Sequence, residues 1–197
     1  MSTQITNILL VGVGGQGILL ASEILSEAAM LAGFDVKKSE IHGMSQRGGS
    51  VVSHVRYGHE VFSPIVPEGE GNVLFGFELM ETCRSLPLIR PGGIVVANDL
   101  QISPPSVLMG QETYPADLVL RIQDHFPDFL LVDGQKLALD AGNVRAANTV
   151  LLGAVSRRLE IAEEFWMKAI EKMVPVKALE VNKKAFLIGR GLSYEST

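Results

Sequence analysis

The segment 12–17, with the sequence Gly-Val-Gly-Gly-Gln-Gly, has the residue types and spacing to admit a phosphate. The apolar run before it, residues 8–11, is typical of a buried strand, and the residues after it are typical of a helix. In this order the first glycine permits a tight turn, the second lets phosphates approach the backbone, and the third lets helix and strand pack closely. Free N–H groups in the first helical turn also favour an anion. We therefore predict an anion-binding crevice after the first strand, although the glycines do not specify the anion.

A second polar motif, His-Gly-Met-Ser-Gln-Arg-Gly-Gly, occupies residues 42–49. It offers a titratable imidazole in His42, a hydroxyl in Ser45, an amide in Gln46 and a guanidinium in Arg47. Arg47 could hold a carboxylate or phosphate in a bidentate fork, and ligand-handling residues are common on loops. The alternative is a polar turn in which Gln46 and Arg47 only cap helix ends or bond loop carbonyls. Composition alone leaves both interpretations open.

The chain contains one cysteine, Cys83, so it has too few thiols for an internal disulfide or an iron–sulfur cluster. Leu79, Cys83 and Leu86 share one face of an expected helix, which favours a core position over a nucleophile. The four histidines, His42, His54, His59 and His125, lack metal-ligand spacing. We therefore expect no metal site.

Composition favours one globular domain over residues 1–197, of which 47% are hydrophobic and only 20% charged. The apolar balance suggests that a partner covers part of the surface, and it is also compatible with self-association of the chain when alone. A net charge of −5 argues against a nucleic-acid or anionic-membrane surface. The apolar runs are too short to span a bilayer and no signal-peptide pattern is present, so we expect a cytoplasmic protein.

Strands and helices alternate along the chain, which predicts an α/β fold: a doubly wound, Rossmann-like, mostly parallel sheet with a helical C-terminal tail. Expected strands are residues 6–13, 34–41, 50–57, 73–77, 94–98 and 129–132. Expected helices are residues 16–32, 78–89, 115–126, 135–141, 144–159, 163–173 and 176–188.

The clean alternation of residues 50–57, followed by Gly58-His59, predicts an antiparallel hairpin with residues 60–63. Residues 91–93, Pro-Gly-Gly, are expected to form a turn, and residues 64–71 and 103–113 are expected to be loops.

Taken together, the two motifs resemble the gamma-type domain of the 2-oxoacid:ferredoxin oxidoreductase family. The form of residues 42–49 is most similar to that of the members that act on indolepyruvate. The resemblance extends over residues 8–159 and includes Glu-Leu-Met-Glu at 78–81, Arg-Pro-Gly-Gly at 90–93 and Asn-Thr-Val-Leu-Leu-Gly at 148–153. Gly71-Asn72 departs from the family pattern, which has an aspartate there.

The resemblance implies a subunit that is inactive alone. In this family a thiamine diphosphate subunit decarboxylates the 2-oxoacid, its iron–sulfur clusters pass electrons to ferredoxin, and coenzyme A takes the acyl group. The gamma-type domain packs beside the thiamine site and helps to bind coenzyme A. The implied cofactor-binding residues are Gly12, Gly14, Gly15, Gln16, Gly17, Ser45, Gln46, Arg47 and Gly48, with His42 as a group that exchanges protons near thiamine.

Each of these roles has a structural alternative. The glycines could form an empty turn, Gln16 could only cap a helix, Arg47 could form an interface salt bridge, and His42 could bond a loop carbonyl. Asn148 could bond the backbone near the glycine turn or be a buried structural amide.

Other functions fit parts of the chain. Glu40 lies about 23 residues after Gly17, where an NAD-dependent dehydrogenase places its ribose-binding acid, although Lys37 and Lys38 adjoin it. An adenylating enzyme of the ubiquitin-activating type shares the glycine turn, but usually brings several cysteines. A non-catalytic scaffold subunit with an empty crevice is the third alternative.

Overall fold

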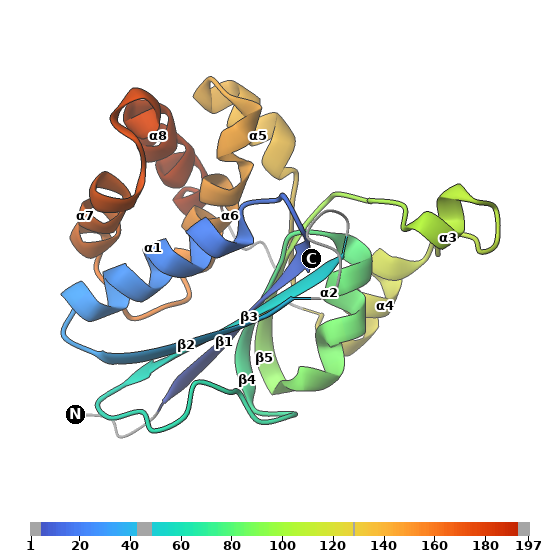
Figure 1. Ribbon diagram of the computed structural model, residues 1–197, viewed down its shortest axis with the longest axis horizontal. Coiled ribbons are helices and arrows are strands. Elements are labelled where there is room, and N and C mark those ends of the chain that lie inside the picture. The colour runs from blue at the N-terminus through green and yellow to red at the C-terminus, as the bar shows by residue number, and fades with distance from the viewer. Residues whose placement is uncertain (1–4, 43–48, 128, 193–197) are drawn as a thin grey trace.

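The computed structural model describes residues 5–42, 49–127 and 129–192. A six-stranded sheet in the order β2-β3-β1-β4-β5-β6 forms its centre, and helices cover both faces (Figure 1). All strands but β3 run in the same direction, since β3 pairs antiparallel with both of its neighbours. This confirms the predicted doubly wound, mostly parallel sheet. The strands are β1 Thr6–Val13, β2 Asp35–His42, β3 Ser50–Gly58, β4 Gly71–Gly76, β5 Ile89–Asn98 and β6 Leu130–Val132.

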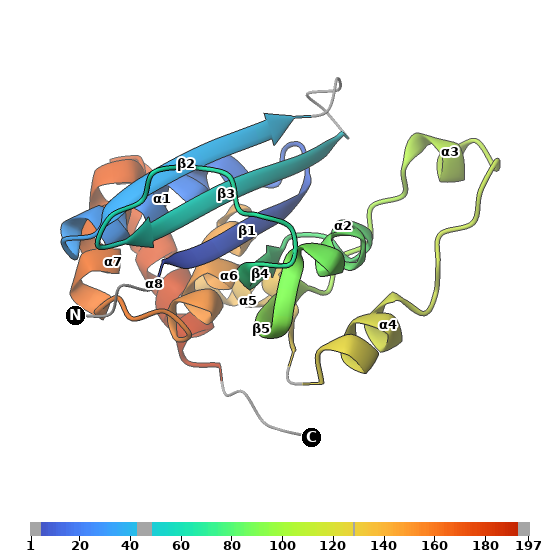
Figure 2. The ribbon, with the colours of Figure 1, turned by 90° about the horizontal axis from the view of Figure 1, so that it is seen from below.

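The helices divide unequally between the two faces of the sheet. Helices α1, α5, α6, α7 and α8 lie on one side, which we call the α1 face, and α2 and α4 lie on the other, the α2 face (Figure 1). The short helix α3 lies on an arm that extends away from the body of the protein (Figure 2). The α-helices are α1 Ile18–Leu31, α2 Leu79–Ser85, α3 Pro105–Leu108, α4 Leu118–His125, α5 Gly134–Ala141, α6 Ala147–Ser156, α7 Glu163–Met173 and α8 Leu179–Arg190, with 3-10 turns η1 Leu86–Leu88, η2 Val144–Ala146 and η3 Val176–Ala178.

Strand β1 separates two hydrophobic cores because successive side chains of a strand point to opposite faces. Ile8 and Leu10 are buried in the larger core under α1 and the C-terminal helices. Leu9 and Val11 are buried in the smaller core under α2 and α4. A strand buried on both faces reads as a continuous apolar run, as residues 8–11 do.

The predicted helical tail packs against the α1 face, and two glycines set its closest approach. A Cβ at Gly153 of α6 would lie 2.1 Å from the Phe186 carbonyl oxygen, and one at Gly189 of α8 would lie 1.8 Å from that of Val150. The backbones of α6 and α8 therefore approach each other more closely than any residue with a side chain would allow.

The sheet contains the predicted antiparallel pairing, between β2 and β3, but the partner predicted for residues 50–57 is wrong. Residues 60–63 form no strand; β3 instead pairs with β2 on one side and β1 on the other. The Val61 N–H donates to Asp35 Oδ2 at 2.8 Å, which ties this segment to the start of β2. Alternation identifies a half-buried strand, but it does not identify the strand's partner.

Smaller differences concern element ends. Residues 91–93 belong to β5, where the register against β4 shifts between Gly71 and Val73 and Gly92 has a φ of +72°. The region 103–113 contains helix α3 as well as loop. Among the described residues, no helix is long and apolar enough to cross a membrane.

Candidate functional site

A crevice of about 510 Å³ opens at the carboxyl edge of the sheet, on the α1 face. Its lining comes from the turn after β1, from Phe77 after β4, from Asn98 at the end of β5 and from the α5–α6 region. The chain leaves β1 through α1 toward β2 and leaves β4 through α2 toward β5, in opposite directions. The crevice therefore lies where the winding of the sheet changes direction, which is where open α/β sheets bind their ligands.

Helix α1 begins at this crevice, directly after the glycine turn, and its N-terminus has no capping side chain. Gly17 is the N-cap residue with a φ of +80°, which strongly favours glycine, and it makes no side-chain capping hydrogen bond. The first turn also contains no acidic residue. The partial positive charge of the helix N-terminus is thus not offset by a carboxylate of its own first turn.

Asn148 joins the glycine turn to α6. Its Nδ2 donates to the Gly17 carbonyl at 3.4 Å, and a Cβ at Gly17 would lie 2.7 Å from that nitrogen. The Asn148 side chain is also buried. Asn148 is therefore both a buried structural amide and a hydrogen-bond partner of the backbone at the glycine turn. The N-cap residue of helix α6 likewise makes no side-chain capping bond and its first turn has no acidic residue, and Asn148 Oδ1 accepts from the Thr149 N–H at 2.9 Å. Two helix N-termini without carboxylates therefore border the crevice.

The Gln16 amide is engaged by the backbone. Its Oε1 accepts from the Val13 N–H at 2.6 Å, and its Nε2 donates to the Phe77 carbonyl at 2.8 Å. A Cβ at Gly12 would lie 2.5 Å from Gln16 Oε1, so Gly12 provides room for this bridge between β1 and β4. These contacts give Gln16 a structural role at the floor of the crevice, and its cofactor contact stays a prediction.

The structure brings the two sequence motifs together through the backbone. The Gly14 N–H donates to the Gly49 carbonyl at 3.0 Å, which fixes the glycine turn to the end of the second motif. Ser45, Gln46, Arg47 and Gly48 lie outside the described residues. His42 ends β2, and its side chain is also outside the description.

Three lining residues were missed by the sequence analysis. Asn98 donates through Nδ2 to the Phe77 carbonyl and accepts from the Gly134 N–H, both at 3.1 Å, and so ties three elements at the crevice floor. Gln135 carries a buried Oε1 without a hydrogen-bond partner among the described residues. Arg145, from η2, is exposed at the mouth. No local signal marks these residues, because their proximity arises only when α5 and α6 pack onto the sheet.

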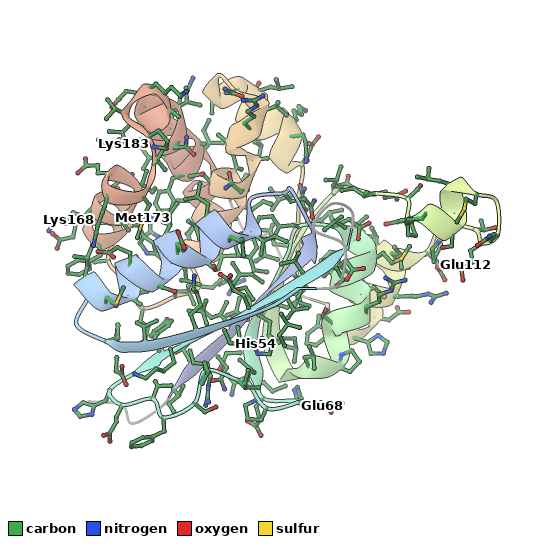
Figure 3. The ribbon with its side chains drawn as sticks, viewed as in Figure 1. His54, Glu68, Glu112, Lys168, Met173 and Lys183 are labelled. Atoms are coloured by element: carbon green, nitrogen blue, oxygen red, sulfur yellow. The ribbon has the colours of Figure 1, made fainter. Side chains whose placement is uncertain are left out.

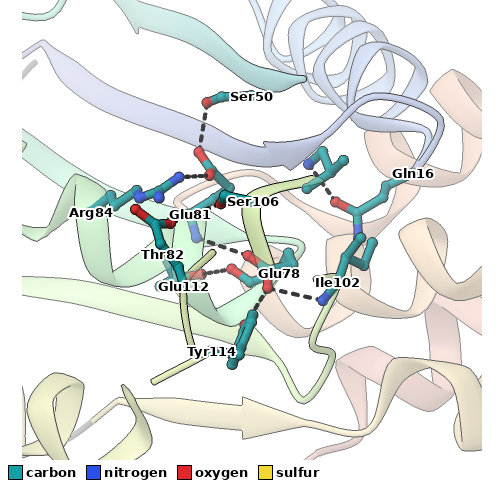
Figure 4. Close-up of polar contacts among 11 residues, drawn as sticks. Gln16, Ser50, Glu78, Glu81, Thr82, Arg84, Ile102, Ser106, Glu112 and Tyr114 are labelled. Carbon is teal, nitrogen blue, oxygen red and sulfur yellow. Dashed lines mark hydrogen bonds and ion pairs between the residues drawn. The ribbon is translucent and has the colours of Figure 1, made fainter. Parts of the chain in front are cut away.

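A different polar cluster lies on the α2 face of the same sheet edge (Figure 4). Glu78 is only 1% exposed, and its carboxylate accepts from the Glu81 N–H at 2.9 Å, from the Ile102 N–H at 3.2 Å and from the Tyr114 hydroxyl. The two latter donors flank the arm that carries α3. Burial and the neighbouring carboxylate raise the pKa of Tyr114, so this hydroxyl stays protonated. Glu78 thus caps α2 and clamps both ends of the arm.

Glu81 extends this cluster toward the second motif. Its carboxylate accepts from the Ser50 hydroxyl at 2.6 Å and from Arg84 Nη1 at 2.7 Å (Figure 4). Ser50 begins β3, directly after residues 42–49. The segment Glu-Leu-Met-Glu at 78–81 therefore has a structural function: it anchors the arm and the start of β3.

The contacts argue against the dehydrogenase alternative. In the dinucleotide-binding fold the ribose-binding acid ends the strand beside β1, whereas β3 separates β2 from β1 here. Glu40 instead forms an ion pair with Lys38 at 2.9 Å. The sequence spacing matched because it counts residues along the chain and contains no information on strand order.

Cys83 and Asn72, which the sequence analysis also considered, both lie in structural surroundings. Cys83 packs into the core of the α2 face as expected, and burial raises the pKa of its thiol. Asn72, at the departure from the family pattern, accepts from the Asn7 N–H at 2.8 Å at the opposite edge of the sheet from the crevice. No cluster of three metal-ligating side chains occurs within residues 5–42, 49–127 and 129–192.

Comparisons with known proteins agree with this picture. Residues 7–192 match the family model for pyruvate ferredoxin/flavodoxin oxidoreductase. The chain is 43% identical to the indolepyruvate oxidoreductase subunit IorB of Thermococcus kodakarensis, over 93% of each chain. It superposes with a TM-score of 0.67 on the gamma subunit of a keto/oxoacid ferredoxin oxidoreductase from Geobacter sulfurreducens, at 26% identity over 93% of this chain and 95% of that one.

A more distant structural neighbour shares the fold alone. The 2-oxoglutarate:ferredoxin oxidoreductase of Magnetococcus marinus, solved with 2-oxoglutarate, coenzyme A and succinyl-CoA bound, aligns with a TM-score of 0.71 at 18% identity. The match covers 99% of this chain and 32% of that longer one.

Proposed function

The chain belongs to the pyruvate ferredoxin/flavodoxin oxidoreductase family, and from this premise we propose that it is the gamma-type subunit of an indolepyruvate:ferredoxin oxidoreductase. The complex converts an aryl 2-oxoacid and coenzyme A into the acyl-coenzyme A and carbon dioxide. The two electrons released pass one at a time to ferredoxin. The relative that is 43% identical over 93% of the chain supports indolepyruvate as the substrate.

This chain supplies only part of such an enzyme. One cysteine is too few for an iron–sulfur cluster, so the clusters belong to a partner subunit. The family resemblance assigns thiamine diphosphate to the same partner. The chain forms a single domain that functions in the cytoplasm and contacts ferredoxin through the complex. We expect no turnover of indolepyruvate by the chain alone.

The crevice is the proposed site for coenzyme A, and the observation that carries this is the character of its lining. Two helix N-termini without acidic first turns and the guanidinium of Arg145 border it, and none of its described lining residues carries a carboxylate. The unpaired Gln135 Oε1 offers an acceptor to a ligand. The helix N–H groups and the Arg145 guanidinium fit the phosphates of coenzyme A, and the Gln135 oxygen can accept from a hydroxyl or N–H of the ligand. Coenzyme A supplies the thiol that accepts the acyl group.

The arm around α3 is the proposed contact surface for a partner subunit, at the same edge of the sheet as the crevice. Leu108 and Met109 are 76% and 64% exposed on it, and Glu78 holds its ends. Exposed apolar side chains on a protruding segment are typical of a subunit contact. We place the thiamine subunit on this arm. Replacing both residues by glutamate should prevent assembly, while Phe62→Glu, at an equally exposed position on another loop, should not.

The test of the function is reconstitution with a thiamine and iron–sulfur subunit. Ferredoxin reduction that requires indolepyruvate, coenzyme A and both subunits is the expected result. Titration of the chain by calorimetry should show coenzyme A binding and no binding of NAD or NADP. Tight NAD binding, or turnover by the chain alone, would contradict the proposal.

Arg47 keeps its predicted role as an anion contact from the second motif. In the complex, Arg47→Ala should weaken the use of coenzyme A or of the 2-oxoacid by about 1.5–3 kcal/mol, because a charge-assisted hydrogen bond is lost. Unchanged kinetics in an intact complex would remove Arg47 from the site.

A further inference from the structure

A second hollow, of about 330 Å³, adjoins the crevice on the α1 face. Leu20, Arg145 and Asn148 line both hollows, so Arg145 lies at their boundary. The second hollow continues toward η3 and α8, where Lys177 and Asn182 line it. We call the crevice and this second hollow together the cationic groove.

Charge distinguishes the groove from the rest of the molecule. The chain carries a net charge of −5, yet among the described residues that line the groove the charged ones are Arg145 and Lys177, and none is Asp or Glu. Both cations are exposed, and neither side chain forms an ion pair or hydrogen bond with another part of the described chain. Most other lysines of the C-terminal helices are neutralised: Lys168, Lys172 and Lys183 each pair with a glutamate. A groove with two unpaired cations and no acid is suited to an anionic ligand.

The positions of the cations indicate two separate anionic groups. Arg145 stands between the hollows, beside the N-termini of α1 and α6. Lys177 lines only the second hollow, whose walls also include the apolar Val174, Pro175 and Val181. An apolar wall next to a lysine suits a nucleoside that carries its own phosphate. A single phosphate at the glycine turn would leave Lys177 without a partner.

We propose that the cationic groove binds a nucleotide with two phosphate sites, a diphosphate held by Arg145 and the helix N-termini and a separate ribose phosphate held by Lys177. The inference rests on the proposed function, because coenzyme A has both groups: a diphosphate at the 5′ position and a monophosphate at the 3′ position. Lys177 is then the residue that distinguishes coenzyme A from dephospho-coenzyme A. Arg145 binds both compounds.

The experiment compares three ligands by calorimetric titration of the full chain: coenzyme A, dephospho-coenzyme A and adenosine 3′,5′-bisphosphate. The wild-type chain should bind coenzyme A about 1.5- to fivefold more tightly than dephospho-coenzyme A, the range of an exposed charge pair. Lys177→Gln should reduce coenzyme A binding to the level of dephospho-coenzyme A and leave dephospho-coenzyme A binding unchanged. Arg145→Gln should weaken binding of both. The matched control is Lys168→Gln on the outer side of α7 (Figure 3), which should change neither.

Either of two results would contradict the proposal that the groove has two phosphate sites. The first is a Lys177→Gln chain that folds normally, by circular dichroism, and keeps the wild-type preference for coenzyme A. The second is the absence of binding of all three ligands, both to the chain and to the reconstituted complex. Tighter binding of NADP than of coenzyme A that depends on Lys177 would keep the two phosphate sites but replace the ligand, and so would overturn the assignment to coenzyme A.

The experiments distinguish failure of the groove proposal from failure of the proposed function. If the chain assembles with a thiamine subunit and reduces ferredoxin in a coenzyme A-dependent reaction, but Lys177→Gln has no effect, the proposed function holds and the groove is contradicted. If Lys177→Gln abolishes binding of adenosine 3′,5′-bisphosphate, but the wild type neither assembles nor turns over, the groove holds and the proposed function is contradicted.

Discussion

Helices α1 and α2 begin at the same edge of the sheet, after the neighbouring parallel strands β1 and β4, but they treat their N-termini in opposite ways. At α2 the Glu78 side chain accepts from the Glu81 N–H, and Glu81 adds a second carboxylate in the first turn. At α1 the N-cap is Gly17, no side chain caps the turn, and the first turn has no acid.

This difference separates a helix end with a structural role from one that we propose binds a ligand. An exposed or unpaired N–H at a helix start needs an acceptor, and the acceptor can belong to the chain or to a ligand. On the α2 face the chain provides the anion, and the result is a clamp that holds the arm. On the α1 face the first turn of the helix has no acid and Arg145 lines the crevice, so under the proposal a ligand brings the negative charge. Four substitutions or conditions test the contrast.

Removing the internal anion should have the largest effect. Glu78→Ala leaves three donors without their acceptor in a buried site, so we expect a loss of about 3 kcal/mol in the free energy of unfolding, measured with urea. Tyr114→Phe, which removes one donor and retains the carboxylate, should cost about 1 kcal/mol. Equal, small losses in both variants would mean that Glu78 is not the centre of the clamp.

The open helix end depends on glycine. Gly17→Ala combines a positive φ with a Cβ placed 2.7 Å from Asn148 Nδ2, and should cost about 1–3 kcal/mol in unfolding free energy and weaken coenzyme A binding. Gly33→Ala is the matched control, because its φ is +89° and no atom lies within 4 Å of the added Cβ. If the two variants lose the same stability, the α1–α6 contact at Asn148 contributes nothing.

Supplying α1 with a carboxylate should make it resemble α2. Leu19, exposed in the first turn of α1, can be replaced by glutamate. We expect a gain of about 0.3–1 kcal/mol in stability from the helix dipole, together with weaker binding of coenzyme A by calorimetry. Leu19→Gln, which adds no charge, should show neither change. Undiminished affinity in Leu19→Glu would contradict an anion site at this end.

Titration of a buried histidine on the α2 face should give the smallest effect. His54 Nδ1 accepts from the Val66 N–H at 3.1 Å, and burial lowers the pKa of its imidazole below the unfolded value of 6.5 (Figure 3). The folded state therefore favours the neutral ring. The stabilising effect is complete above about pH 6.5 and is lost as the pH falls through the lower folded pKa. Urea unfolding at pH 7.5 and 5.5 should show a larger decrease for the wild type than for His54→Gln. The same decrease in both proteins would exclude this histidine as the cause.

Sequence patterns predicted the parts of the site that follow from neighbours along the chain. The apolar run 8–11 and the glycines after it were sufficient for β1, the tight turn and the start of α1. The link from Asn148 to the glycine turn was among the expected alternatives, and the helices of the C-terminal region were located to within a few residues.

Sequence patterns did not predict features that depend on contacts between residues far apart in the chain. The alternation of residues 50–57 identified a strand, but its insertion between β2 and β1 comes from backbone pairing on both sides, and that order is what moves Glu40 away from a ribose-binding position. Arg145 and Lys177 come from separate turns before α6 and α8, and only the packing of those helices brings both to one groove.

The amino-acid order by itself determined the elements, their buried faces and the uncapped glycine turn, because these depend on periodicity and on conformations of adjacent residues. The tertiary structure decided which strand borders which, which helix end meets a carboxylate and where the unpaired cations gather. Those outcomes depend on contacts between residues far apart in the sequence, such as Gly17 with Asn148 and Glu78 with Tyr114, and local patterns do not encode them.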